Sequence, residues 1–258
     1  MTRIEVQIYE IQDPREAEAV IELGVDRIGS VILGEENWKV PAIRDAISIS
    51  KGARVKHSLI PLFHRRGVLF KAIEYYQPDI VHFCGGLTHD DGRMMPCEPL
   101  VELQTCIRKR FPEIEIMRSV PVVAPESSQT IPTLEIARYF EAASDYFLID
   151  TSLGSEPVEG YIGITGRTCD WAVARELAES SPIPVILAGG LSPENVYEGL
   201  MVVKPFGVDS CTRTNAADGS GRPVRFKKDP DKVALFVREV RRAERDLSSK
   251  LKATNGSY

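Results

Sequence analysis

A single carboxylate, Asp150, closes the apolar run "YFLID" in the stretch "YFLIDTSLG". A run this apolar is typical of a strand that is buried on both faces. Helix capping does not explain the charge, because no helical pattern begins before "RTCDWAVARELAES", although aspartate is also common in turns. A carboxyl group held at the end of a rigid strand is suited to acid–base chemistry. We therefore take Asp150 as a candidate catalytic group, with a simple turn residue as the alternative.

Two later strand ends carry groups suited to binding an anion. The apolar run "VILA" leads into Gly189 and Gly190, and Ser192 then resembles the cap of a helix. Glycines let the backbone approach a ligand closely, and free N–H groups at a helix start can bind phosphate. The next strand ends in "VDSCTRT", which offers the hydroxyl of Thr212 and the cation of Arg213. Together these two segments predict a phosphate-binding site.

The elements that position these residues alternate regularly along the chain. Eight strand-like runs are each followed by a helical pattern, from "RIEVQIY" with "DPREAEAVIELG" to "FGVDSC" with "DPDKVALFVREVRRAERDL". Connections after helices are short, whereas several after strands are long, such as "TSLGSEPVEGYIGITGR" and "TRTNAADGSGRPVRFKK". This pattern predicts an α/β fold, a single (β/α)8 TIM barrel with its site at the C-terminal strand ends. The alternative, an open doubly wound sheet, more often has a glycine-rich turn after the first strand, which "IYEIQDP" lacks.

Length and composition agree with one catalytic domain. The 258 residues suffice for a barrel of about 250, and we expect a barrel domain over 1–248 with a flexible C-terminal tail over 249–258. The net charge of −5 and the lack of a basic stripe argue against nucleic-acid binding. No apolar run approaches the roughly 20 residues of a membrane span. Five scattered cysteines suggest a reducing cytoplasm, and we expect no cofactor and either a monomer or a homodimer.

Several of these motifs resemble the phosphoribosylanthranilate isomerase family. "LIDT", "GITGRTCDW", "ILAGGLSPENV" and, more loosely, "FGVDSCTRT" are similar to its sixth, seventh and eighth units, and "AEAVIELGVDRIGSV" to its start. The resemblance implies an Amadori-type aldose–ketose isomerisation of a phosphoribosyl amine in tryptophan biosynthesis. It implies a phosphorylated small-molecule substrate, with Asp150 as the acid that protonates the sugar ring oxygen. It also places Gly163, Thr165 and Gly166 in a loop that binds the substrate.

The general base is less clear at the first strand. The family carries a cysteine there, in a Lys-Ile-Cys-Gly-Ile pattern, whereas this chain reads "QIYEI" with Tyr9 at the cysteine position. A phenol with a pKa of about 10 is a poor base at neutral pH. Glu10 is the other candidate, but alternation along a strand points it to the opposite face unless the strand has already ended.

Other polar residues are expected at the mouth of the barrel. We predict substrate-binding roles for His57, His82, Cys84 and Arg118, with buried structural side chains as the alternative. His57, His82, Cys84 and Asp150 could also ligate a metal, but their spacing is not a ligand signature and we predict no metal site. The family's substrate-holding arginine falls near Trp38, where this chain offers only Lys39.

Two other functions remain open at this point. One is a related phosphate-binding barrel enzyme, an epimerase or lyase acting on another phosphosugar, possibly with a metal. The other is a non-catalytic relative that binds a phosphoribosyl group and has lost its base.

Overall fold

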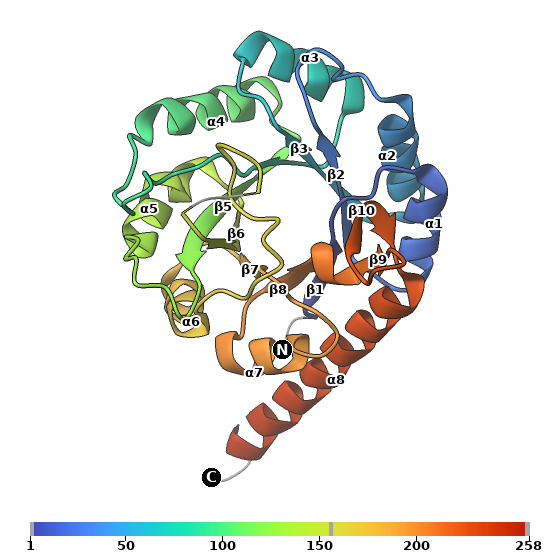
Figure 1. Ribbon diagram of the computed structural model, residues 1–258, viewed down its shortest axis with the longest axis vertical. Coiled ribbons are helices and arrows are strands. Elements are labelled where there is room, and N and C mark those ends of the chain that lie inside the picture. Colours follow the sequence, from blue (N-terminus) through green and yellow to red (C-terminus); the bar gives the residue numbers. More distant parts are fainter. Residues whose placement is uncertain (1–2, 155–156, 256–258) are drawn as a thin grey trace.

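A closed barrel of eight parallel strands forms the centre of the protein (Figure 1). The computed structural model describes residues 3–154 and 157–255. Each barrel strand pairs with its neighbours in sequence, and β1 closes the barrel against β8. The barrel strands are β1 (Glu5–Ile8), β2 (Arg27–Ile32), β3 (Lys56–Pro61), β4 (Ile80–Phe83), β5 (Glu115–Val123), β6 (Tyr146–Ser152), β7 (Val185–Leu187) and β8 (Gly207–Ser210).

Helices surround the barrel as an outer ring (Figure 1). They are α1 (Pro14–Glu22), α2 (Pro41–Ala53), α3 (Arg66–Tyr76), α4 (Glu98–Arg110), α5 (Thr133–Phe140), α6 (Trp171–Ser180), α7 (Val196–Val203) and α8 (Pro230–Asn255). Short 3-10 helices occupy Glu141–Ala143 and Thr212–Thr214. The side chain of Asp13 accepts hydrogen bonds from two N–H groups at the start of α1, as its sequence predicts. The predicted TIM barrel is therefore confirmed.

Two helix boundaries differ from the sequence predictions. Helix α8 continues to Asn255, so the helix runs through the position at which we expected a tail to begin, and residues 256–258 lie outside the described chain. Helix α7 begins at Val196 rather than at Ser192. The side chain of Asn195 accepts a hydrogen bond from the Ser192 N–H, which holds the preceding residues in a turn.

A short antiparallel hairpin, β9 (Asn215–Ala217) and β10 (Pro223–Lys228), follows β8 and was not predicted. In Figure 1 it lies beside α1. Lys228 anchors the hairpin: its N–H donates to Glu16 of α1, and its ammonium group donates to the Cys211 carbonyl at 2.9 Å. The long loop after β8 is thus an ordered structure held against the first unit of the barrel.

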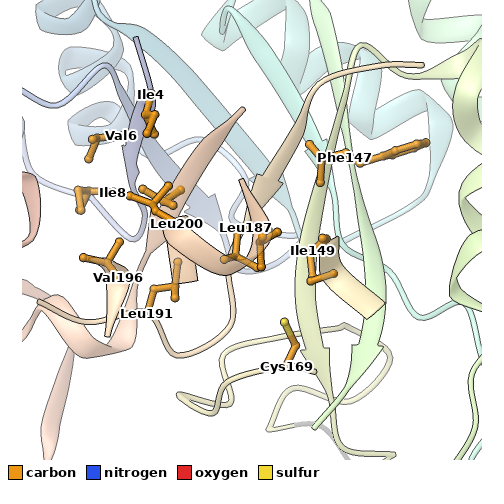
Figure 2. Close-up of a cluster of buried hydrophobic side chains, with 14 of the residues drawn as sticks. Ile4, Val6, Ile8, Phe147, Ile149, Cys169, Leu187, Leu191, Val196 and Leu200 are labelled. Carbon is orange, nitrogen blue, oxygen red and sulfur yellow. The ribbon is translucent and has the colours of Figure 1, made fainter. Parts of the chain in front are cut away.

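Side chains on the outer faces of the strands form the main hydrophobic core (Figure 2). Figure 2 shows Phe147 and Ile149 of β6 in this core, together with Leu187 of β7 and Leu200 of α7. Successive side chains of a strand point to opposite faces. Because Phe147 and Ile149 point outward to the helices, Asp150 points into the barrel.

The barrel interior has its own apolar layer and a charged lower end. Tyr9, Met117, Leu148 and Ile186 pack together inside the strands. Below them, at the N-terminal strand ends, buried Arg27 pairs with Glu5 at 3.0 Å. The barrel interior beneath the C-terminal strand ends is therefore filled with packed side chains. In the part of the chain that the structure describes, no helix is both long enough and apolar enough to span a membrane.

Candidate active site

Asp150 lies at the C-terminal end of β6, where the following loop folds back over it. The carboxylate is partly buried, and its Oδ1 accepts a hydrogen bond from the Thr151 N–H at 2.9 Å. Gly163 of that loop has φ of +99°, and a Cβ at this position would overlap the Asp150 carboxylate. The N–H of Ile162 donates to the Cys84 carbonyl at 2.8 Å, which ties the loop to the end of β4. The loop therefore closes on Asp150 and requires a glycine where it does so.

A largely apolar cavity of about 520 Å³ opens beside Asp150. No lysine or arginine of the described residues lines it. Its apolar wall is formed by Tyr9, Val31, Ile60, Leu62, Leu148, Tyr161, Ile162 and Ile164, and its polar groups include Glu10, His82, Cys84, Ser119, Asp150 and Asp209. The cavity is suited to a flat apolar group next to a set of carboxyl groups.

A second cavity, of about 320 Å³, lies between the loops that follow β6, β7 and β8. It brings together the four residues predicted to bind phosphate, Gly189, Gly190, Thr212 and Arg213, with Thr165 and Gly166 of the predicted substrate-binding loop. Asp150, Ile164, Asp209 and Cys211 line both cavities. The two cavities therefore meet at Asp150 and Asp209.

The glycine loop of the second cavity has no room for side chains. Gly189 has φ of +81° and a Cβ there would overlap the Thr151 hydroxyl. Gly190 has φ of +56° and a Cβ there would lie 2.6 Å from the Arg167 carbonyl carbon. Such positive φ values are costly for any residue except glycine. The close approach leaves bare backbone facing the cavity, as a phosphate site needs.

Arg213 reaches from the β8 side of this cavity to the β6 loop. Its Nε donates a hydrogen bond to the Gly166 carbonyl at 2.9 Å, while the side chain remains exposed. The guanidinium group thereby adds positive charge to the glycine and threonine side of the cavity, and it ties two loops together.

Tyr9 is part of a buried hydrogen-bond network across the barrel. Its hydroxyl lies 2.5 Å from Ser58 Oγ and 2.7 Å from Nδ1 of His82. Nε2 of His82 lies 2.8 Å from Ser119 Oγ. Burial, above all, raises the pKa of Tyr9 well above its usual value and lowers the pKa of His82 to about 3. Both side chains line the apolar cavity as neutral groups, so Tyr9 is poorly suited to accept a proton there.

Cys84 also lines the apolar cavity, at the end of β4. Burial raises the pKa of its thiol to about 12, with Asp150 adding to this effect and Arg118 opposing it. The thiol is therefore protonated at neutral pH and offers a weakly polar contact to a ligand.

Glu10 lies just past the end of β1, and its φ of +65° turns the side chain inward. The residue is only 2% exposed and lines the apolar cavity. Its Oε1 accepts a hydrogen bond from Nε of Arg225 at 2.8 Å, whereas Oε2 is buried without a hydrogen-bond partner among the described residues. The strand has ended before Glu10, which is the condition under which the sequence allowed it to face the site.

Asp209, which the sequence analysis did not select, is a second carboxyl group at the junction of the cavities. It lies on β8, and its Oδ1 accepts a hydrogen bond from Gln7 Nε2 at 3.1 Å. Burial raises the pKa of Asp209 to about 8, although the Gln7 hydrogen bond lowers it in part. The side chain therefore carries a proton at neutral pH. The pattern that identified Asp150, an apolar strand ending on a carboxylate, also occurs in "FGVD".

Two predicted substrate-binding residues lie outside both cavities. His57 faces α2, where its ring nitrogens contact Ser50 and Ser30, and burial lowers its pKa to about 3. Arg118 faces α5, where its guanidinium group lies 4.8 Å from the centroid of the Phe140 ring and donates to the Gly85 carbonyl. Both point outward because their strand neighbours Ser58 and Ser119 point inward.

The outer loop residue Trp38 packs against tyrosine rings of α3 rather than against the site. Its ring centroid lies 5.6 Å from that of Tyr75, and the Lys39 ammonium group lies over the Trp38 ring. Neither side chain lines the apolar cavity.

Within residues 3–154 and 157–255, no three histidine, cysteine, aspartate or glutamate side chains gather in a way that could hold a metal ion.

The sequence profile of the family described as N-(5'-phosphoribosyl)anthranilate (PRA) isomerase matches residues 104–239. The N-(5'-phosphoribosyl)anthranilate isomerase of Methanothrix thermoacetophila is 30% identical over 243 residues, which cover 93% of this chain and 99% of the relative. The chain belongs to the phosphoribosylanthranilate isomerase family. The isomerase of Methanosarcina acetivorans is also 30% identical, over 93% of this chain and 95% of its own length.

Solved structures of phosphoribosylanthranilate isomerases share the fold. The crystal structure of the Thermotoga maritima isomerase aligns with a TM-score of 0.67 at 23% identity, covering 92% of this chain and 98% of that one. A phosphoribosylanthranilate isomerase in complex with reduced 1-(o-carboxyphenylamino)-1-deoxyribulose 5-phosphate aligns with a TM-score of 0.64 at 22% identity, covering 92% of this chain and 98% of that one.

Proposed function

We propose that this protein catalyses the Amadori-type isomerisation of phosphoribosylanthranilate, an aldose–ketose interconversion in tryptophan biosynthesis. The observation that carries the proposal is the position of Asp150, which lines both the apolar cavity and the glycine-loop cavity. The substrate has a phosphate at one end, an aromatic ring at the other and the reacting carbons between them. The phosphate matches the glycine loop, the reacting carbons match the carboxyl groups, and the aromatic ring matches the apolar cavity.

The substrate's phosphate would lie against Gly189, Gly190 and the Thr212–Arg213 segment. The aromatic ring would then occupy the apolar cavity, and the ribose would lie at the junction beside Asp150. A relative that has been crystallised with a ring-bearing ribulose phosphate supports this assignment. Binding the two ends would fix the ribose against the acid, which lowers the entropic cost of reaction.

Asp150 would act as the general acid. It would protonate the ribose ring oxygen while the amine nitrogen's electron pair forms the C1–N double bond and the C1–O bond breaks. Removal of the C2 proton would then give an enol-amine, and transfer of protons to C1 and from the C2 hydroxyl would give the ketose. In each of these steps the protein has only to donate or accept a proton, which agrees with a site built from carboxyl groups.

The test is a turnover assay on the purified protein, following loss of the substrate's fluorescence, together with rescue of a tryptophan auxotroph that lacks the isomerase. We expect the wild type to be active in both and Asp150→Asn to lose turnover by about 10²–10⁴-fold. Asp150→Asn should still bind inorganic phosphate, because the glycine loop is intact, whereas Gly190→Ala should bind it more weakly. A wild type without turnover in either assay would refute the function.

One observation favours a related substrate as a second candidate. No arginine or lysine of the described chain lines the apolar cavity, and Lys39 lies over Trp38 instead. A carboxylate on the aromatic ring would find no cation there. Comparing kcat/KM for phosphoribosylanthranilate and phosphoribosylaniline distinguishes the two, since a carboxylate-free substrate should react at least as well if this candidate is right.

The five cysteines are all free thiols, which supports the expected reducing compartment and a cytoplasmic location. The related Thermotoga maritima enzyme is described as dimeric, and a homodimer or a monomer remains our prediction for this chain.

A further inference from the structure

We propose that Glu10 accepts the proton from C2 of the sugar and that Arg225, on the β9–β10 hairpin, holds Glu10 in position. The proposal rests on the proposed isomerisation and identifies the base that this reaction requires. The two residues are 215 positions apart in sequence, and the fold brings them together where Glu10 lines the apolar cavity.

The backbone of Glu10 is in a left-handed conformation, which is unfavourable for glutamate. Glutamate rarely adopts φ of +65°, because a left-handed conformation is strained for any residue with a Cβ. Non-glycine residues held in such conformations are concentrated at functional sites. This conformation directs a carboxylate, 98% shielded from solvent, into the cavity that also holds Asp150.

Arg225 binds one oxygen of Glu10 and leaves the other facing inward. Both Nε and Nη2 of Arg225 donate to Oε1, whereas Oε2 has no hydrogen-bond partner among the described residues. Arginine donates in a fixed planar geometry, so a two-donor contact fixes the position of Oε1 at the cavity rim. Oε2 is then left as the proton-accepting atom.

The hairpin that carries Arg225 is itself fixed to the barrel. Lys228, at the end of β10, donates its N–H to Glu16 of α1 and its ammonium protons to the carbonyl of Cys211 and the side chain of Asn215, at 2.9 and 2.5 Å. Lys228 is 5% exposed. These contacts make the hairpin a rigid support rather than a surface loop.

The charged and titratable groups around Glu10 come from β8, β10 and the loop between them. Arg225 provides the direct positive contact, and Lys228 adds a more distant positive charge behind Cys211. The Cys211 thiol, whose pKa is raised chiefly by burial and further by Glu10, stays neutral. Asp209 is protonated at neutral pH. Glu10 is therefore the group near β1 that is placed to act as a base, since Tyr9 is a neutral, hydrogen-bonded phenol.

The step balances without any other reactant. Oε2 of Glu10 takes the C2 proton, the C2–H electron pair forms the C1–C2 double bond, and the C1–N π electrons return to nitrogen. The resulting enol-amine becomes the ketose when C1 gains the proton held by Glu10 and the C2 hydroxyl gives its proton to the Asp150 carboxylate. The protons added and removed are equal in number, so Glu10 and Asp150 return to their starting states.

The experiment compares Glu10→Gln, Glu10→Gly and Tyr9→Phe with the wild type, using phosphoribosylanthranilate with hydrogen or deuterium at C2. Both Glu10 variants should lose kcat by about 10²–10⁴-fold with KM changed less than threefold. Glu10→Gly tests folding as well, because glycine accepts the positive φ. The thermal midpoint of this variant should not fall below that of Glu10→Gln. Tyr9→Phe should keep most turnover, with proton removal still sensitive to deuterium.

Arg225→Gln tests the positioning role, with Arg225→Lys as the conservative variant and Arg222→Gln as the matched control on the same hairpin. Arg222 is exposed, and among the described residues it pairs with Asp218 and Ser220 of the hairpin tip. We expect Arg225→Gln to lower kcat by about tenfold and to move the acidic limb of the kcat/KM profile to higher pH. Arg225→Lys should restore part of both, and Arg222→Gln should match the wild type.

The outcomes separate this proposal from the function on which it rests. An active wild type whose Glu10→Gln variant retains turnover within tenfold would refute Glu10 as the base and leave the isomerisation intact. Identical pH profiles for Arg225→Gln and Arg222→Gln would refute the role of Arg225. An inactive wild type would overturn the function and this proposal together.

Discussion

The hydroxyl of Tyr9 lies 2.7 Å from Nδ1 of His82, inside the barrel and below the candidate catalytic carboxyl groups. The same hydroxyl contacts Ser58, and His82 continues the network to Ser119 on β5. Strands β3, β4 and β5 and the end of β1 are thereby joined through buried polar side chains. A buried network of this kind stabilises one arrangement of the barrel interior as long as each member keeps its partners.

Tyr9→Phe should therefore reduce stability more than it reduces turnover. Removing the hydroxyl leaves the His82 nitrogen and the Ser58 hydroxyl without a partner, and an unpaired buried polar group costs about 1–3 kcal/mol. Urea denaturation measures this loss in the free energy of unfolding. Loss of turnover by 10²-fold or more with unchanged stability would instead mean that the phenol takes part in the chemistry.

Gly163→Ala should damage the site through Asp150. The new Cβ would overlap the Asp150 carboxylate and would also have to adopt φ of +99°. Overpacking of this kind costs about 1–3 kcal/mol, and the displaced carboxylate should lose activity as well. Gly160→Ala is the matched control, because Gly160 has φ of +78° with nothing within 4 Å of its Cβ position.

A double-mutant cycle separates the two costs of Gly163→Ala. In an Asp150→Ala background the overlap disappears and only the φ cost remains, so the substitution should cost about as much as Gly160→Ala does. Additive effects of Gly163→Ala and Asp150→Ala on the free energy of unfolding would contradict the contact, since residues in contact are expected to couple.

The barrel and the position of the two loops after β7 and β8 were predictable because both depend on features that are local in sequence. Alternating apolar periodicities identify strands and helices, and glycines with small polar residues directly after a strand identify a loop at the C-terminal face. Asp150 was found for the same reason. Asp209 follows the same rule in "FGVD", but its strand contains two fewer apolar residues and its loop was assigned to phosphate instead.

The direction in which a strand residue points was not predictable at His57 and Arg118. Parallel barrel strands are buried on both faces, so apolar residues occur at both parities and do not mark the interior. The immediate neighbours of His57 and Arg118 do not mark which face is inside, and only the assembled barrel shows that Ser58 and Ser119 face inward. The contact between Arg225 and Glu10 could not be predicted either, because it joins the hairpin after β8 to the end of β1, 215 positions earlier in the sequence.

Asp209 should make the protein less stable as pH rises through the neutral range. Burial raises its folded pKa to about 8, whereas an unfolded aspartate has a pKa of about 3.9. Between these values the folded state binds one proton more than the unfolded state. The free energy of unfolding then falls as pH rises, by up to about 1.4 kcal/mol per pH unit for one proton. The stability that the Asp209 proton contributes is complete below about pH 4 and is lost by about pH 8.

Asp209→Asn removes this contribution and keeps a side chain whose oxygen can accept the Gln7 hydrogen bond. His57 and His82, whose pKa values are lowered to about 3 by burial, also change stability with pH below about 6.5. They are present in both proteins, so their effect cancels in the difference. Urea denaturation between pH 5 and 7.5 should show the variant gaining stability relative to the wild type as pH rises. Asp45→Asn, at an exposed position on α2, serves as the control and should give a constant difference. A constant difference for Asp209→Asn as well would mean that Asp209 is ionised in the folded protein and cannot hold a proton at the junction of the two cavities.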